Sequence, residues 1–133
     1  MMPESRRRWE PVSPGSDVPP PRGAYSPAVR AGDFVYVSGQ VPRDAATGEL
    51  RGGDTAEQTR YTLEKLEGVL RAAGGTLADV VSVTAYLQDI GDWEAFDRVY
   101  AETFRAPYPT RTTVGADLGG VRVEISAVAY LPR

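Results

Sequence analysis

The sequence contains no cysteine and no histidine among its 133 residues. Without cysteine, the chain cannot form a disulfide, a thiolate nucleophile or a cysteine metal site. Without histidine, it cannot build a Ser-His-Asp triad, a histidine metal cluster or an imidazole acid/base group that works near neutral pH. Any chemistry must therefore come from Asp, Glu, Arg, Tyr, Ser, Thr, backbone groups and water.

The sequence also has almost no lysine, and its arginines form no basic cluster beyond the first residues. Lys65 is the only lysine beside fourteen arginines, and it falls on a charged helix face, so we expect no Schiff-base role for it. The net charge is −3 and no basic cluster occurs after the first residues, so we expect no nucleic-acid partner.

Long apolar runs are missing as well. No segment approaches the length of a membrane span. The "RRR" at 6–8 leads into Pro, Ser and Gly rather than an apolar segment, which is unlike a secretory signal. We therefore expect no membrane association and a cytoplasmic location.

The length suits one compact domain, and 41% apolar with 25% charged residues is an ordinary globular composition. Residues 1–22 are rich in Pro, Arg, Ser and Gly, which is typical of an arm without its own core. The sequence thus predicts an N-terminal arm at 1–22 and a single domain at 23–133.

The first half of the domain predicts a β-hairpin and a helix. The segment "YSPAVRAGDFVYVSGQVP" alternates in the manner of strands, with "AGD" at 31–33 as the turn. A helix over 55–73 follows, with Thr55 and Gln58 as a capping box and Gly74-Gly75 as the stop. Its predicted buried stripe comprises Thr59, Leu63, Leu66, Leu70 and Ala73.

The second half predicts a strand, a helix and a second hairpin. The strand at 79–89 places Val81, Val83, Ala85 and Leu87 on one face. Asp92 can cap a helix over 93–105, and the prolines that follow prevent its continuation. The aromatic residues of this helix are expected in the core, without a function: Trp93, Phe96, Tyr100 and Phe104.

The element order is β-β-α-β-α-β-β, which predicts an α+β domain with one mixed β-sheet and two α-helices packed on one face. Several strands carry apolar or aromatic residues on both sides, so the other sheet face also needs a cover. In so short a chain, a partner subunit is the simplest cover.

The closing segment "YPTRTTVGADLGGVRVEI" looks like two strands joined by a tight turn. If residue 117 pairs with 120, Arg111, Thr113, Glu124 and Ser126 share one face. Thr113 then lies opposite Glu124, and Arg111 lies diagonally at roughly 7–8 Å from Glu124. The other face, under the helices, would hold Thr112, Val114, Ala116, Val121, Val123, Ile125 and Ala127.

Two interpretations of Arg111 and Glu124 follow from this placement. They are either exposed strand residues, alone or in a surface ion pair, or a functional pair. Arginine binds a carboxylate through two parallel N–H···O bonds, and glutamate can act as a general base toward water. The functional interpretation is a site that holds an acid by its carboxylate and delivers water to the neighbouring carbon.

Five segments in order resemble the Rid family (reactive intermediate deaminases, YjgF-type) across residues 23–130. These segments are "AYSPAVRAGDFVYVSGQVP", "EQTRYTLEKLEGVLRAAG", "DVVSVTAYLQDIGDWEAFDRVYAETF", "PYPTRTTV" and "VRVEISAVA". The resemblance implies a chorismate-mutase-like fold, assembled as a homotrimer with sites between neighbouring subunits. It also implies hydrolysis of 2-imino acids and their enamine tautomers, such as 2-aminoacrylate and 2-iminobutanoate, to 2-keto acids and ammonia.

The resemblance also implies roles for individual residues. Arg111 matches the arginine that binds the substrate carboxylate, and Glu124 matches the glutamate that orients or activates water. Tyr25 matches a tyrosine contributed across the interface, Ser38 and Gly39 match a turn that lines the pocket, and Thr113 stands where the archetype has cysteine. Since water attack on a protonated imine needs no metal or cofactor, we expect neither.

Other positions depart from the family pattern. The turn at 116–121 is two residues shorter and lacks a proline, Asp97 replaces an asparagine, and Ser126 replaces a glutamate. Alternatives therefore stay open: a paralogue that acts on a different enamine acid in a catabolic or biosynthetic pathway, or a non-catalytic binding or chaperone-like trimer.

Overall fold

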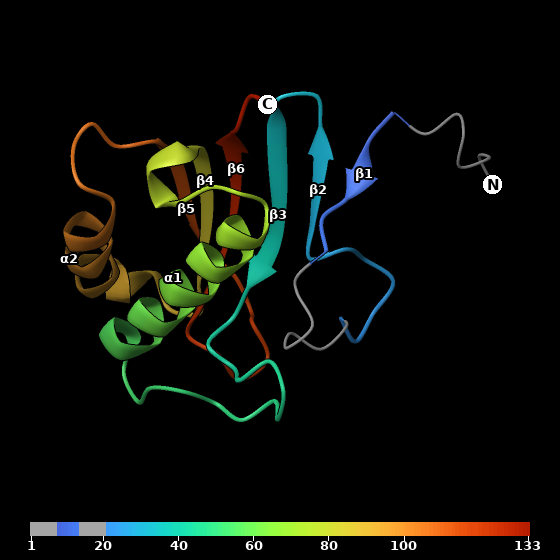
Figure 1. Cartoon of the computed structure of the whole chain (residues 1–133). Helices are drawn as coiled ribbons and strands as arrows, with labels where there is room; N and C mark the ends of the chain where they lie inside the picture. Colours follow the sequence, from blue (N-terminus) through green and yellow to red (C-terminus); the bar gives the residue numbers. More distant parts are fainter. Residues whose placement is uncertain (1–7, 14–20) are drawn as a thin grey trace.

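Figure 1 shows two helices packed on one face of a six-stranded sheet, in a computed structural model that describes residues 8–13 and 21–133. The helices are α1 (Thr55–Ala72) and α2 (Trp93–Phe104), with short 3-10 turns at Leu77–Asp79 and Ile90–Asp92. The strands are β1 (Glu10–Pro11), β2 (Ala28–Ala31), β3 (Phe34–Gln40), β4 (Val80–Leu87), β5 (Thr110–Gly115) and β6 (Val123–Tyr130).

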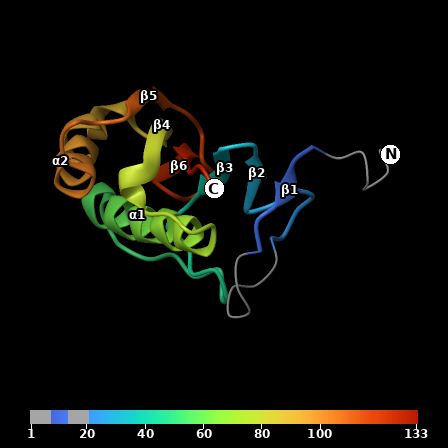
Figure 2. The same ribbon diagram turned by 45° about the horizontal axis from the view of Figure 1, so that its top comes forward.

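The strand order in the sheet is β1-β2-β3-β6-β4-β5. All neighbours pair antiparallel except β4 and β5, which are parallel. The predicted α+β class and the order from β2 to β6 are confirmed. The short strand β1 is additional: it lies in the predicted arm and pairs with β2, and the two extend the sheet past the helices in both views (Figures 1 and 2). Most of the arm lies outside the described residues.

The core lies between the helices and the sheet. Thr59, Leu63, Leu66 and Leu70 of α1 are buried, as the predicted stripe requires, and Ala73 packs against the core. Val35 and Val37 of β3 are buried, while Phe34 and Tyr36 face the other way. The period-two alternation expected for this strand is confirmed, and the valines form its core face.

The sheet face opposite the helices is uncovered in the single chain. Its large apolar side chains are 40–47% exposed, and they include Phe34, Tyr36, Val114 and Tyr130. The rings of Phe34 and Tyr130 lie 5.4 Å apart between centroids, so they form a contiguous aromatic surface. We call this the outer face. In the described part of the chain, no helix has both the length and the apolar character needed to span a membrane.

The prediction that Val81 shares a face with Val83, Ala85 and Leu87 is wrong. Val81 is exposed, and Val80 is buried in its place. The pairing of β4 with β6 slips between Val80 and Ser82, so one extra residue is accommodated there. Such a bulge reverses the side-chain alternation at one point, and Val83, Ala85 and Leu87 return to the core face as predicted.

The predicted pairing of the last two strands with one another is also wrong. β4 lies between β5 and β6 and pairs with both. The segment β4-α2-β5 is instead a parallel crossover unit. The chain returns through α2 to the end of the sheet where β4 begins, so β5 runs in the same direction as β4. The residues from 116 to 122 consequently pass across the end of β4 rather than forming a tight turn.

This topology changes which residues of β5 face the helices. Arg111 aligns with buried Val83, and Thr113 with buried Ala85, so both lie on the helix side. Thr112 and Val114 face outward, contrary to the prediction. The faces of β6 are as predicted, with Val121, Val123, Ile125 and Ala127 buried.

The N-cap of helix α1 lies one residue before the predicted cap, Thr55. Asp54 is the N-cap, and its carboxylate accepts a hydrogen bond from the Glu57 backbone N–H at 2.8 Å. Glu57 accepts in return from the Asp54 N–H, which completes a capping box. Thr55 and Gln58 do not form the predicted box and are instead buried.

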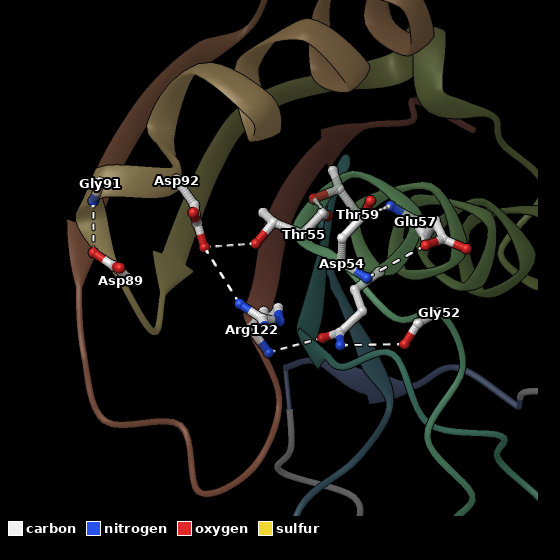
Figure 3. Close-up of polar contacts among 10 residues, drawn as sticks. Gly52, Asp54, Thr55, Glu57, Thr59, Asp89, Gly91, Asp92 and Arg122 are labelled. Carbon is white, nitrogen blue, oxygen red and sulfur yellow. Dashed lines mark hydrogen bonds and ion pairs between the residues drawn. The ribbon is translucent and has the colours of Figure 1, made fainter.

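A polar network joins the starts of α1, α2 and β6 (Figure 3). The buried amide of Gln58 accepts from the Arg122 backbone N–H at 2.8 Å and donates to the Gly52 carbonyl at 3.3 Å. Asp92, at the N-cap of α2, accepts from the Thr55 hydroxyl at 2.7 Å and pairs with the Arg122 guanidinium at 3.7 Å. This network fixes the chain just before β6.

We expect Gln58→Ala to lower the free energy of unfolding by about 1–3 kcal/mol, because it removes a buried side chain and leaves the part-buried N–H of Arg122 and carbonyl of Gly52 without partners. Urea denaturation monitored by circular dichroism measures the change. The matched control is Gln88→Ala, which removes an exposed amide that accepts one backbone bond from Leu118. Equal losses in the two variants would contradict the structural role of Gln58.

Candidate functional site

Arg111 lies on β5, the strand at one edge of the sheet. Its side chain is on the helix side, under α2. Its guanidinium carbon is 5.3 Å from the ring centre of Trp93, 5.2 Å from Phe96 and 4.5 Å from Tyr100. These distances are within the range of cation–π attraction. The three rings form an aromatic box around the cation, and its side chain is only 16% exposed.

Asp97 completes the box with an opposite charge. Its Oδ1 lies 2.8 Å from Arg111 NH1, so the two side chains form a close ion pair. Tyr100 lies beside this pair, and its hydroxyl is buried without a hydrogen-bond partner among the described residues. Burial raises the pKa of the Tyr100 phenol to about 12; Arg111 opposes this rise and Asp97 adds to it. The phenol is therefore protonated at neutral pH.

Sequence reasoning placed these aromatic residues in the core without a function. Phe96 and Tyr100 are buried, as expected, but Trp93 is 41% exposed and all three contact Arg111. A signal was available: Trp93, Phe96, Asp97 and Tyr100 recur at helical spacing on one face of α2. The parallel β4–β5 pairing, once recognised, would have brought β5 beneath that face.

Glu124 lies on the outer face, two strands away from Arg111, and contacts Gly39. A Cβ atom added to Gly39 would lie 2.2 Å from Glu124 Oε2, so the carboxylate rests directly against the glycine backbone. The pairing of β3 with β6 slips between Val37 and Gln40, which places Gly39 in an irregular part of the strand. The structure thus brings Gly39 and Glu124 together.

Ser38 ties the preceding loop to the same region. Its hydroxyl donates to the Ser26 carbonyl at 2.6 Å, and its N–H donates to the Pro27 carbonyl at 2.9 Å. Tyr25 lies next to these residues and is 57% exposed. An open hollow of about 690 Å³ is bordered by Tyr25, Ser38, Tyr36 and Trp9 among others. Neither Arg111 nor Glu124 borders this hollow.

The predicted residues therefore fall into two groups. One group is Arg111 and Thr113, on the helix side of β5; the other is Tyr25, Ser38, Gly39 and Glu124, on or beside the outer face. Glu124 aligns with Tyr86, and Tyr86 with Val114, so two strand spacings and three residues separate Glu124 from Arg111. That offset amounts to roughly 14 Å between Cα atoms. The prediction that Arg111 and Glu124 share a face is wrong, because β4 lies between their strands.

Lys65 holds the loop before α1 in place. Its ammonium group donates to the carbonyls of Val41 at 2.9 Å and Arg43 at 2.8 Å. Burial lowers the pKa of the Lys65 ammonium. Both bonds go to backbone oxygens, so this lysine fastens the loop to α1. In the ranges that the structure describes, no three acidic side chains gather as metal ligands.

Comparison with known proteins decides the family. The family model described as Endoribonuclease L-PSP, that of the YjgF/RidA proteins, matches residues 15–131. The chain belongs to the Rid family. A RutC family protein of Pyrococcus horikoshii is 43% identical over 86% of this chain and 92% of its own length.

Two further Rid relatives carry names that state an activity. The 3-aminoacrylate deaminase RutC of Acinetobacter baylyi is 40% identical over 85% of this chain and 91% of that protein. The human 2-iminobutanoate/2-iminopropanoate deaminase is 37% identical over 80% of each chain.

Solved structures show the same Rid fold. A Thermotoga maritima protein matches with a TM-score of 0.84 at 35% identity, covering 93% of this chain and 98% of that one. RidA from a Psychrobacter species matches with a TM-score of 0.79 at 36% identity, covering 86% and 94%. The expected chorismate-mutase-like fold is confirmed.

The contact between Gly39 and Glu124 predicts a local effect of Gly39→Ala. The added methyl group would occupy the place of the Glu124 carboxylate, which is the flexible end of its side chain and can move. We expect a displaced carboxylate, visible in a crystal structure of the variant, with a change in unfolding free energy within about 1 kcal/mol.

The control is Gly68→Ala on the exposed side of α1, where a new Cβ meets nothing within 4 Å. This change is expected to stabilise the helix by about 0.5–1 kcal/mol and to leave Glu124 in place. An unmoved Glu124 carboxylate in Gly39→Ala would show that the close contact does not exist in solution.

Proposed function

We propose that this Rid protein hydrolyses reactive 2-imino acids, and their enamine tautomers, to 2-keto acids and ammonia. The observation that carries the proposal is Arg111, a partly enclosed guanidinium in an aromatic box at the sheet edge. Deaminase names among relatives at 37–40% identity support the same reaction class.

The reaction suits a chain without histidine and cysteine. Water adds to the carbon of the protonated C=N bond, the C–N bond then breaks, and one keto acid and one ammonia leave. No electrons are transferred. The protein has to hold the acid, place one water molecule and move protons between oxygen and nitrogen, which are tasks for an arginine and a carboxylate.

In this scheme Arg111 binds the substrate carboxylate and Glu124 orients the water molecule. The contact of Glu124 with Gly39 would place the carboxylate beside backbone N–H groups of β3. Backbone groups at Ser38, Gly39 and Thr113 complete the pocket, and Tyr25 contributes from the loop that Ser38 holds.

We further propose that the protein is a homotrimer with sites between subunits. Two observations support it: the outer face is apolar and uncovered, and Arg111 lies roughly 14 Å from Glu124 on the opposite side of the sheet. A small imino acid cannot bridge that distance within one chain. A site would then combine Arg111 and Thr113 of one subunit with the Glu124 group of a neighbour.

A second candidate is an enamine acid with its nitrogen on C3, of the 3-aminoacrylate type. It is favoured by the 40% identity to a relative named for that activity. The carboxylate anchor is common to both substrates, so the position of the nitrogen relative to Glu124 would decide between them. Comparing rates on freshly generated 2-aminoacrylate, 2-iminobutanoate and 3-aminoacrylate separates the two candidates.

We expect the purified protein to accelerate release of keto acid and ammonia from freshly generated 2-aminoacrylate. Arg111→Ala should reduce kcat/KM by roughly 30-fold or more, because loss of a charge-assisted carboxylate contact costs about 2–5 kcal/mol. Glu124→Gln should mainly reduce kcat, since it removes the proton acceptor.

The control is Arg98→Ala, which removes an exposed arginine of α2 and should retain wild-type rates. If the wild-type protein adds nothing to the spontaneous rate, the protein is not a deaminase for this substrate. A non-catalytic trimer would show that result while still binding carboxylate ligands.

Mixing subunits tests the composition of the site. Arg111→Ala and Glu124→Gln chains are unfolded together and refolded as mixed trimers. If each site draws Arg111 and Glu124 from different subunits, some sites in a mixed trimer contain both intact residues, so activity should return to a substantial fraction of wild type. Refolding each variant alone provides the baseline, and a mixture no more active than this baseline would show that both residues of a site come from one chain.

A further inference from the structure

The anchor arginine already holds a carboxylate from its own chain. Asp97 Oδ1 lies 2.8 Å from Arg111 NH1, and the Asp97 side chain is 39% exposed while that of Arg111 is 16% exposed. The carboxylate therefore faces the accessible side of the aromatic box rather than a sealed interior. A ligand that approaches Arg111 meets Asp97 as well.

The surrounding rings restrict how the guanidinium can respond. Trp93, Phe96 and Tyr100 lie within 5.3 Å of its carbon atom, so the group cannot turn freely away from Asp97. A guanidinium carries five N–H donors in a fixed plane. Asp97 lies against NH1 as an ion-pair partner, and the donors on the other nitrogens are enough for one further carboxylate.

We propose that Asp97 is a specificity-determining residue, an internal carboxylate that makes the anchor electrically neutral before a ligand arrives. This inference rests on the proposed carboxylate-binding role of Arg111. A neutral anchor accepts a monocarboxylate weakly and releases it readily, and it disfavours a dicarboxylate, whose second charge adds to the repulsion. The substrate class narrows accordingly to imino acids with a single carboxylate and an uncharged side chain.

The expected effect of Asp97 on the dissociation constant follows from simple electrostatics. Two carboxylates that share one guanidinium lie roughly 5 Å apart, close enough for like-charge repulsion to act within a Debye length of about 8 Å. For a partly exposed pair, we expect this repulsion to change a dissociation constant by roughly tenfold. That change is large enough to measure by calorimetry.

The test is Asp97→Asn, which keeps the side-chain shape and an oxygen beside Arg111 NH1 but removes the charge. Isothermal titration calorimetry with 2-oxobutanoate and oxaloacetate compares two stable-carbonyl ligands that differ by a second carboxylate in place of a methyl group. We expect Asp97→Asn to bind 2-oxobutanoate about tenfold more tightly than wild type, and to gain still more for oxaloacetate.

The matched control is Glu102→Gln, which removes one negative charge from the same helix at a position on the groove between α1 and α2. It should leave both dissociation constants within about twofold of wild type, since Glu102 lines that groove together with α1 residues and not the aromatic box around Arg111. An equal gain in the control would attribute the effect to net charge and overturn the assignment to Asp97.

The remaining outcomes separate this inference from the proposed function. Unchanged or weaker binding by Asp97→Asn, even with a lower melting temperature, would assign Asp97 a structural role and overturn the inference. The proposed anchor would still stand if wild type binds and Arg111→Ala does not. If Asp97→Asn binds the ligands and wild type does not, the inference is supported. If neither wild type nor Asp97→Asn binds them, the inference and the proposed anchoring role of Arg111 are both overturned.

Discussion

The parallel pairing of β5 with β4 is the constraint on which the arrangement of the candidate site depends. The crossover through α2 sets β5 on the far side of β4 from β6, and it places the helix directly over Arg111. The same step fixes Arg111 and Glu124 on opposite faces. Every functional interpretation of the chain has to start from two separated groups rather than from one pocket.

Burial of a cation explains the composition of α2. An arginine that is 16% exposed needs compensation for lost hydration, and it obtains this from three aromatic faces and one carboxylate. The same contacts also set how strongly the guanidinium of Arg111 attracts an anionic ligand. The rings leave its charge available, whereas Asp97 partly neutralises it. The balance between them therefore affects both stability and binding.

Much of the fold follows from local patterns in the sequence. The alternation in β6 and the stripe of α1 identified their buried faces, because a half-buried element repeats with its own period. The bulge at Val80 and the cap at Asp54 were missed because each shifts a pattern by one residue. The faces of β5 were reversed because a Gly-rich connection suggested a hairpin, although strand-helix-strand order from 80 to 115 indicated a parallel pair. Contacts such as Gly39 with Glu124 depend on tertiary register, which no local pattern contains.

The exposed apolar side chains and Glu124 share the outer face, and a covering chain would affect both. Exposed apolar area on this face is unfavourable in water, and it belongs to Phe34, Tyr36, Val114 and Tyr130. Glu124 on the same face needs a bound substrate and a positioned water molecule within reach in order to act as a base. Covering the face with another chain would bury the apolar side chains and bring a neighbour's Arg111 toward Glu124. Exclusion of bulk water would then strengthen the charge interactions of both residues. In the proposed trimer, assembly and completion of the site are therefore the same event.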